Sequence, residues 1–349
     1  MERNLYNELK AWKISNNRKP LILSGARQVG KTWLLTEFAR REYAKNVFFS
    51  LDRNKDARKV FQQGGSAQQL LQRLSALSGV DITEGDTLLI LDEIQDCPEA
   101  LTALKFFCEE TPQIHIAVAG SLLGVSMHSN VSFPVGKVDV LRLYPLTFSE
   151  FLRAMGRDKM ADFLSIGNWA DIDALSDAYV DLLRQYYYVG GMPEVVLSYV
   201  NNGKHQEVRA LQNKILSDYE ADFSKHASAN EVARIRMVWQ NIPAQLAKEN
   251  KKFVYGAIKQ GARAATFEVA LYQPGHHVEK VHHAFGIHAG DRFTVDFTFV
   301  GLDAGINRID TEDIYVGVCR ILARQPMQTA LVAGACVDKA GQIIGRMIA

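Results

Sequence analysis

One octapeptide limits what this chain can fold into more than any other stretch. Residues 25–32 read GARQVGKT, which fits the pattern G-x-x-x-x-G-K-[ST] at every fixed position. The apolar run 21–23 precedes it, and a helical pattern from about Lys31 to Tyr43 follows it. A buried strand, a glycine-containing turn and a helix are the setting in which this pattern binds phosphate. The alternative, an ordinary turn between a strand and a helix, is disfavoured by that setting.

The residue types in the octapeptide suit a phosphate group. Glycines let the backbone turn tightly, so that N–H groups point inward around an anion, and the start of the following helix adds its positive dipole end. The ammonium of Lys31 can reach the β- and γ-phosphates, and the hydroxyl of Thr32 can ligate Mg²⁺. We therefore expect ATP and Mg²⁺ as cofactors. The expected nucleotide-binding residues are Gly25, Ala26, Arg27, Gln28, Val29, Gly30, Lys31 and Thr32.

A second polar group ends an apolar run about sixty residues later. Residues 88–93 read LLILDE, a buried strand that ends in two carboxylates. Such a strand would bring the carboxylates to the edge of the sheet beside the octapeptide. Asp92 is expected to hold Mg²⁺ with Thr32, and Glu93 to polarise a water for attack on the γ-phosphate. The alternative is a strand that merely ends in an acidic turn.

A third candidate, Ser121, follows the apolar run 115–119. It is expected to complete the catalytic set of Lys31, Glu93 and Ser121 by sensing the γ-phosphate. Serine is also a good helix N-cap, and the apolar residues after it are compatible with a helix. Both interpretations stay open.

Apolar runs alternate with helical patterns through the first 150 residues. Strands are expected at 21–25, 46–51, 87–91, 115–119 and 138–143, and helices at 5–12, 31–43, 55–78 and from Pro98. Continuous apolar strands that alternate with helices predict an α/β fold with a parallel sheet covered on both faces. The pattern from 147 to 226 is helical, with a break at 188–193. After Tyr272 it becomes richer in β-branched residues, with a strand expected at 292–300.

The composition excludes several classes of protein. None of the four cysteines lies in a C-x-x-C pair, so a disulfide scaffold and a cysteine-type zinc site are excluded. The 40 basic and 39 acidic residues balance, so the overall charge does not indicate nucleic-acid binding. Every apolar run falls far short of the roughly 18 residues that a membrane span needs. With no signal-peptide pattern at the N-terminus, we expect a cytoplasmic protein without a membrane partner.

Five segments together carry a family resemblance. They are GARQVGKT, LLILDEIQDCPEAL, VAGSLLGV, LRLYPLTFSEFL and YVGGMPEVV. Over about residues 1–283 the chain resembles the prokaryotic AAA+-type P-loop ATPases, similar to archaeal-type, STAND-like ATPases, whose C-terminal half is a domain of unknown function. The resemblance implies a RecA-like core with strand order 5-1-4-3-2, then a helical lid and a winged-helix segment. The expected divisions are a core at 1–155, a lid at 156–228, a winged-helix-like domain at 229–283 and a β-rich tail, atypical or truncated, at 284–349.

The chain departs from the family pattern at two places. Relatives commonly carry Gly-Arg before the fifth strand, whereas this chain has Gly136-Lys137. Lysine cannot make the planar fork of an arginine, so an arginine-finger role does not carry over to this position. Arg142 is a candidate only by its proximity to the core. In the tail, residues 294–297 faintly echo the first acidic strand of a nuclease fold, but no complete nuclease site follows.

Three weaker patterns have plain structural explanations. Residues 231–263 hold seven basic and two acidic side chains, which could contact DNA but are slightly better explained as a solvated or packed helical face. Five histidines at 276, 277, 282, 283 and 288 are more simply a surface cluster than a metal site. Tyr186, Tyr187 and Tyr188 are expected to pack at a helix end rather than stack on a base, and Trp33 is expected to pack into the core.

The leading prediction is an enzyme that hydrolyses ATP in a Mg²⁺-dependent reaction and changes conformation as it does so. The alternative is a nucleotide-gated DNA-binding or signalling module with little turnover. A small-molecule kinase is a third interpretation, disfavoured because a carboxylate directly after Asp92 favours water as the acceptor. Assembly into a homo-oligomer is left open.

Overall fold

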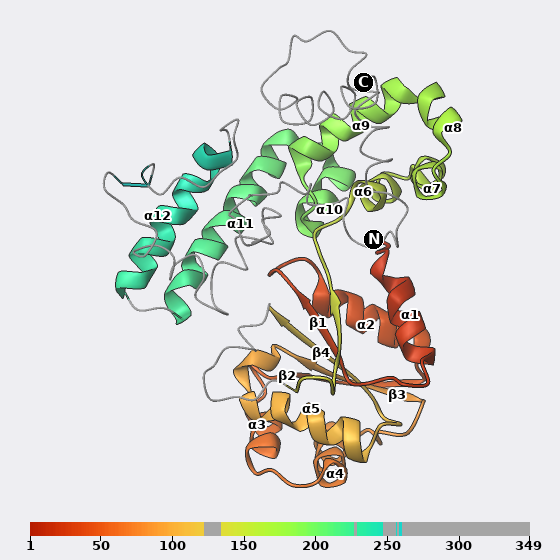
Figure 1. The fold of residues 1–349 in the computed structure, drawn as a ribbon, viewed down its shortest axis with the longest axis vertical. Helices are drawn as coiled ribbons and strands as arrows, with labels where there is room; N and C mark the ends of the chain where they lie inside the picture. Colours follow the sequence, from red (N-terminus) through yellow and green to blue (C-terminus); the bar gives the residue numbers. More distant parts are fainter. Residues whose placement is uncertain (122–133, 227–228, 247–255, 257, 260–349) are drawn as a thin grey trace, which may run out of the picture.

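The computed structural model describes residues 1–121, 134–226, 229–246, 256, 258 and 259 of the chain. Within them, a five-stranded sheet carries helices on both faces, and a separate layer of helices follows it (Figure 1). The strands are β1 Leu21–Gly25, β2 Lys45–Ser50, β3 Thr87–Asp92, β4 His115–Ser121 and β5 Asp139–Arg142. The helices up to β5 are α1 Leu5–Ile14, α2 Lys31–Glu42, α3 Lys55–Gln62, α4 Ala67–Ser78, the 3₁₀ turn η1 Ile94–Asp96 and α5 Pro98–Glu110.

All strands of the sheet run parallel, in the order β2-β3-β4-β1-β5. This is the expected order 5-1-4-3-2 counted from the other edge, so the expected parallel sheet and its strand order are confirmed. The central strand β1 pairs with β4 and β5, and Gly25 lies opposite Ser121. Because the strands are parallel, the C-terminal ends of β1, β3 and β4 lie side by side at the same end of the sheet.

Each face of the sheet has its own apolar core. Leu23 of β1 and Ile90 of β3 point to the face that α1 and α2 cover, and Leu89 and Val118 point to the face that α3, α4 and α5 cover (Figure 1). The alternation within one strand is what a sheet covered on both sides requires. The core expectation for Trp33 is wrong, because its side chain is 48% exposed on the outer side of α2.

The stretch expected to be helical at 55–78 is two helices rather than one. Gly64 and Gly65 separate α3 from α4 with φ values of +66° and +128°. Those angles are outside the helical region, so the helix ends there although the apolar pattern continues. Ser66 then starts α4 with a capping box that pairs it with Gln69.

The described residues after β5 are mostly helical and have a third core. Its helices are α6 Phe148–Ala154, α7 Asp158–Ile166, α8 Trp169–Ala174, α9 Ser176–Val189, α10 Pro193–Asn202, α11 His205–His226 and α12 Ala229–Leu246. Tyr186 of α9 lies in this core, with its ring against Phe148 and Phe151 and its hydroxyl donating to the Leu146 carbonyl at 2.7 Å. The packing expected for this tyrosine is confirmed.

Several expectations fall outside the described residues. They are the winged-helix-like segment beyond α12, the β-rich tail at 284–349 with its strand at 292–300, and the histidine cluster. None of the helices that the structure describes is long and apolar enough to cross a membrane.

Candidate functional site

The octapeptide forms the loop between β1 and α2, and both ends of the loop depend on glycine. At Gly25 φ is +153°, and a Cβ atom there would lie 2.2 Å from the Leu143 carbonyl oxygen. No side chain fits this close approach of two backbone segments. Gly30, with φ of +93°, begins α2 without any side-chain cap, so the helix presents its first N–H groups to the loop.

Lys31 is buried beside the loop that precedes it. Its ammonium donates to the carbonyl oxygens of Gly25 at 2.9 Å and Ala26 at 2.8 Å. These bonds hold the positively charged ammonium at the start of the loop, and Lys31 is only 8% exposed. A cation with so little contact with water is well placed to attract an anion.

Thr32 and Asp92 meet although sixty residues separate them. The Thr32 hydroxyl donates to Asp92 Oδ2 at 2.8 Å, which connects the start of α2 to the end of β3. Burial is the main cause that raises the pKa of Asp92, and the hydrogen bond from Thr32 opposes that rise. A cation beside this carboxylate would favour its charged form.

The Thr32 hydroxyl and the Asp92 carboxylate suit Mg²⁺ if phosphate oxygens of a nucleotide bind the same ion. Mg²⁺ is commonly bound by one or two protein oxygens, with phosphate oxygens and water as its other ligands. Hydroxyl and carboxylate are the hard donors that it prefers. No cluster of three or more His, Cys, Asp or Glu side chains in the described part of the chain could hold a metal alone. The pair therefore suits a metal–nucleotide complex better than a free ion.

Glu93 directly follows the metal-site carboxylate in a rare backbone conformation. Its φ is +52°, and Gln28, with φ of +64°, is the other non-glycine residue in the described ranges with a positive φ. Such conformations cost free energy and cluster at functional sites. The Gln95 amide donates to Glu93 Oε2, while Gln95 Oε1 is buried without a hydrogen-bond partner in the residues described. The amide orients the Glu93 carboxylate, a contact that the sequence analysis missed.

Ser121 ends β4 opposite Gly25, at the edge of the sheet where the loop begins. Its side chain and the residues at 122–133 lie outside what the structure describes, so neither the sensor role nor the N-cap role gains support.

Arg142 is paired with Ser24 in the sheet and is exposed on the edge strand β5. Lys137 forms a surface ion pair with Glu109 at 3.0 Å.

Three further residues contact the loop and carry no motif that marks them in the sequence. Arg3 donates to the Val29 carbonyl at 2.9 Å, and Tyr219 of α11 donates to the Arg27 carbonyl at 2.8 Å. Asp218 accepts a hydrogen bond from the Gln28 amide at 3.1 Å. The helical layer thus contacts the loop directly.

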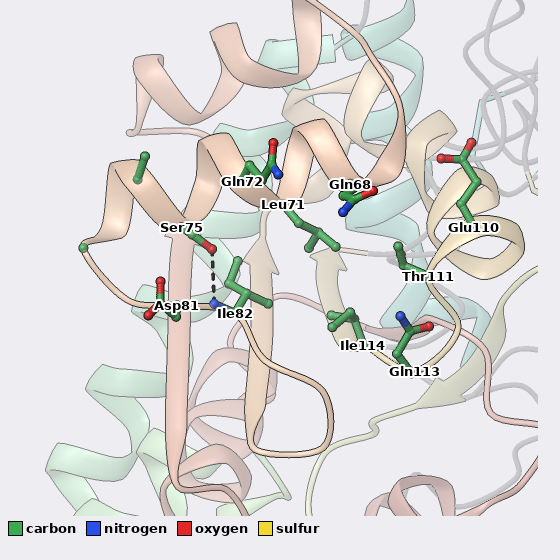
Figure 2. A pocket seen from close by; sticks show the side chains of 12 residues that line it. Gln68, Leu71, Gln72, Ser75, Asp81, Ile82, Glu110, Thr111, Gln113 and Ile114 are labelled. Carbon is green, nitrogen blue, oxygen red and sulfur yellow. Dashed lines mark hydrogen bonds between the residues drawn. The ribbon is translucent and has the colours of Figure 1, made fainter.

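A surface hollow lies at the other end of the sheet. Figure 2 shows it between α4, the segment that leads into β3 and the end of α5, with Ser75 Oγ accepting from the Ile82 N–H at 3.1 Å. This end carries the starts of β3 and β4, whereas the loop and Asp92 lie at the strand ends. The hollow is therefore not part of the candidate site. It is lined by Gln68, Leu71, Gln72, Ser75, Ala76, Gly79, Asp81, Ile82, Glu110, Thr111, Gln113 and Ile114.

The loop, the carboxylate pair and the parallel sheet all lie within the residues that match one family model. A family model described as AAA domain matches residues 17–152. This segment is an AAA domain. The resemblance to AAA+-type ATPases is therefore confirmed. A second family model, described as a domain of unknown function, matches residues 180–272, which agrees with the C-terminal half that the resemblance implied.

The solved structures that resemble this chain share little sequence identity with it. A single-residue variant of RuvB from Thermotoga maritima is 14% identical, with 85% of this chain and 92% of that one covered and a TM-score of 0.41. DnaA from Aquifex aeolicus bound to AMPPCP is 12% identical over 78% of this chain and 87% of that one, with a TM-score of 0.36. ORC1 from Aeropyrum pernix in complex with DNA is 15% identical over 82% and 78%, with a TM-score of 0.34. No curated protein matches the chain. The assignment of residues 17–152 to the AAA domain therefore rests on the family model alone.

Proposed function

We propose that this chain binds ATP at residues 25–32 and hydrolyses it to ADP and phosphate with the help of Mg²⁺. The observation that carries the proposal is the hydrogen bond between Thr32 and Asp92 inside the AAA domain. The residue before Thr32, Lys31, has its buried ammonium at the same loop. A phosphate-binding loop without a carboxylate beside it could serve binding alone. The carboxylate pair adds a place for the metal and a group that can act on water.

Each site residue has one role in the proposed reaction. Lys31 and the loop N–H groups bind the phosphates, and Thr32 and Asp92 would hold Mg²⁺, which would neutralise charge on the phosphate oxygens. Glu93 orients a water molecule and accepts its proton while the water oxygen bonds to the γ-phosphorus. The bond from that phosphorus to the bridging oxygen breaks, and ADP leaves with the electron pair. Ser121 is proposed to contact the γ-phosphate.

Two substitutions test binding and hydrolysis separately. Lys31→Ala is expected to weaken ATP binding by two orders of magnitude or more, because it removes the buried cation. Glu93→Gln is expected to keep ATP binding while hydrolysis falls about 100-fold or more, a typical loss for a general base. The measurements are nucleotide affinity by calorimetry and phosphate release at saturating Mg²⁺ and ATP.

The control is Lys59→Ala, which removes an exposed lysine that pairs with Asp56 on α3. It is expected to match the wild type in both assays. Hydrolysis by Glu93→Gln at the wild-type rate would remove Glu93 from its role, and unchanged binding by Lys31→Ala would overturn the proposed site. Phosphate release without any added acceptor would exclude a small-molecule kinase.

A further inference from the structure

Two carbonyl groups of the phosphate-binding loop are held by side chains that lie outside the loop. The Tyr219 hydroxyl donates to the carbonyl of Arg27 at 2.8 Å, and Arg3 Nη1 donates to the carbonyl of Val29 at 2.9 Å. Tyr219 belongs to α11 in the helical layer, and Arg3 precedes α1. Both side chains therefore come from segments far from the loop in sequence.

The geometry of the peptide bond links each carbonyl to the next N–H group. In a trans peptide the C=O of one residue and the N–H of the next point in opposite directions, and the described residues contain no cis bond. The bond from Tyr219 therefore turns the N–H of Gln28 away from α11, and the bond from Arg3 turns the N–H of Gly30 away from the guanidinium. These two N–H groups donate no hydrogen bond within the described part of the chain. Donors fixed in this way are available to an anion.

The two anchoring side chains are themselves fixed by burial. Arg3 is 7% exposed and forms an ion pair with Glu150 at 3.2 Å, and its guanidinium also donates to the Tyr144 carbonyl. Tyr219 is 4% exposed, and its ring stacks on Trp239 of α12 with centroids 6.1 Å apart. A buried guanidinium that donates in three directions has little freedom to move.

The loop residues between the anchors also need support. Gln28 and Gly30 both have positive φ values, and Gln28 is additionally held by its side-chain bond to Asp218, the neighbour of Tyr219. A left-handed non-glycine residue persists only where its surroundings fix it. Contacts from α11 thus fix the same segment through a backbone carbonyl and through a side chain.

We propose that Arg3 and Tyr219 are positioning residues, which orient the N–H groups of Gly30 and Gln28 toward the phosphates of a bound nucleotide. The inference rests on the proposed function. Nucleotide affinity then depends on α11 staying in contact with the loop, because one of the two anchors belongs to that helix.

A pair of matched substitutions tests the role of Tyr219. Tyr219→Phe removes only the hydroxyl, and Tyr179→Phe removes a hydroxyl that donates to the Met160 carbonyl at the same distance of 2.8 Å, away from the loop. Both variants are expected to unfold at a similarly lowered temperature. Only Tyr219→Phe is expected to weaken ADP binding, by about five- to tenfold, because the Gln28 N–H is then no longer oriented and its hydrogen bond to phosphate is lost. Dissociation constants for ADP, measured well below both unfolding temperatures, give the comparison.

A second pair tests Arg3 in the same assay. Arg3→Lys keeps the charge, but one ammonium cannot hold the Val29 carbonyl, the Tyr144 carbonyl and Glu150 in the same geometry, so ADP affinity is expected to fall about tenfold. The control is Arg153→Lys, at an ion pair with Asp162 in the helical layer. If Arg3→Lys does not fold, the tyrosine pair decides alone.

The outcomes separate this inference from the proposed function. Affinity of Tyr219→Phe equal to that of the wild type, or an equal loss in Tyr179→Phe, overturns the positioning role while ATP binding stands. No ADP binding by the wild-type chain, or unchanged binding by Lys31→Ala, overturns the proposed function and the inference with it.

Discussion

At Gly25 the backbone of β1 approaches the backbone after β5 so closely that only glycine fits. Gly25→Ala is expected to lower the free energy of unfolding by about 3 kcal/mol or more, because its Cβ would overlap the Leu143 carbonyl oxygen and its φ is strained. Chemical denaturation monitored by tryptophan fluorescence provides the measurement.

The matched control is Gly64→Ala, between α3 and α4. Its φ of +66° is also left-handed, but no atom lies within 4 Å of the added Cβ. The expected cost is about 1 kcal/mol, from backbone conformation alone. Equal losses in the two variants would show that the contact with Leu143 is not what requires glycine at position 25.

Single residues were predictable where they belong to a short sequence motif whose chemistry is known. The positions of Lys31, Thr32 and Asp92 were expected from two motifs, and the structure brings Thr32 and Asp92 into contact. Arg3 and Tyr219 could not be found in this way, because neither one arginine before a helix nor one tyrosine within a helix has a local signal. Trp33 was misplaced because an apolar residue in an amphipathic helix can lie at the boundary of the buried stripe.

Three elements of the core meet at His115. The buried imidazole of this β4 residue bonds through Nδ1 to the Tyr43 hydroxyl at 2.7 Å and contacts the ring of Trp12 from α1. Burial, with smaller contributions from Arg18 and Lys13, lowers the pKa of His115 from 6.5 to about 4. Burial of this residue between the strand and α1 thus favours the neutral ring.

The lowered pKa predicts how stability depends on pH. The unfolded chain takes up a proton at His115 near pH 6.5, whereas the folded chain takes it up only near pH 4. The contribution of His115 to stability is therefore complete above pH 6.5 and is lost as the pH falls toward 4, by roughly 1–3 kcal/mol. Urea denaturation at a series of pH values measures this slope.

Two variants show whether the slope belongs to His115. His115→Gln is expected to flatten it between pH 4 and 6.5, whatever its effect on stability at pH 7. Tyr43→Phe keeps the imidazole buried and is expected to retain the slope. A slope that persists in His115→Gln would assign the acid sensitivity to other groups.

Whole elements were predicted best where they are apolar throughout. The strands were found within one or two residues, because buried parallel strands are continuous apolar runs bounded by polar turns. The division between α3 and α4 was missed, since the apolar stripe continues across Gly64 and Gly65. The order of the strands came from the family resemblance, as hydrophobic pattern alone does not specify which strands are neighbours.

At the scale of the whole molecule, a ligand that binds only the folded chain must stabilise it. ADP with Mg²⁺ at about 100 times its dissociation constant is expected to add ~2.7 kcal/mol to the free energy of unfolding and to raise the unfolding temperature by several degrees. Lys31→Ala, at the same nucleotide concentration, is expected to gain about 0.4 kcal/mol or less, whereas Lys59→Ala is expected to shift like the wild type. Thermal unfolding with and without the nucleotide measures the change in unfolding temperature. A change in Lys31→Ala equal to that of the wild type would place the nucleotide-binding site elsewhere.

The strand order has a consequence for synthesis on the ribosome. The octapeptide is translated early, yet in the part of the chain that the structure describes β1 pairs with β4 and β5, which begin at His115 and Asp139. A nascent chain halted before residue 115 would contain β1 and all eight loop residues, but neither of the two strands that pair with β1. Such a fragment should fail to retain nucleotide, and the ability to do so should arise only after the ribosome has completed the fifth strand.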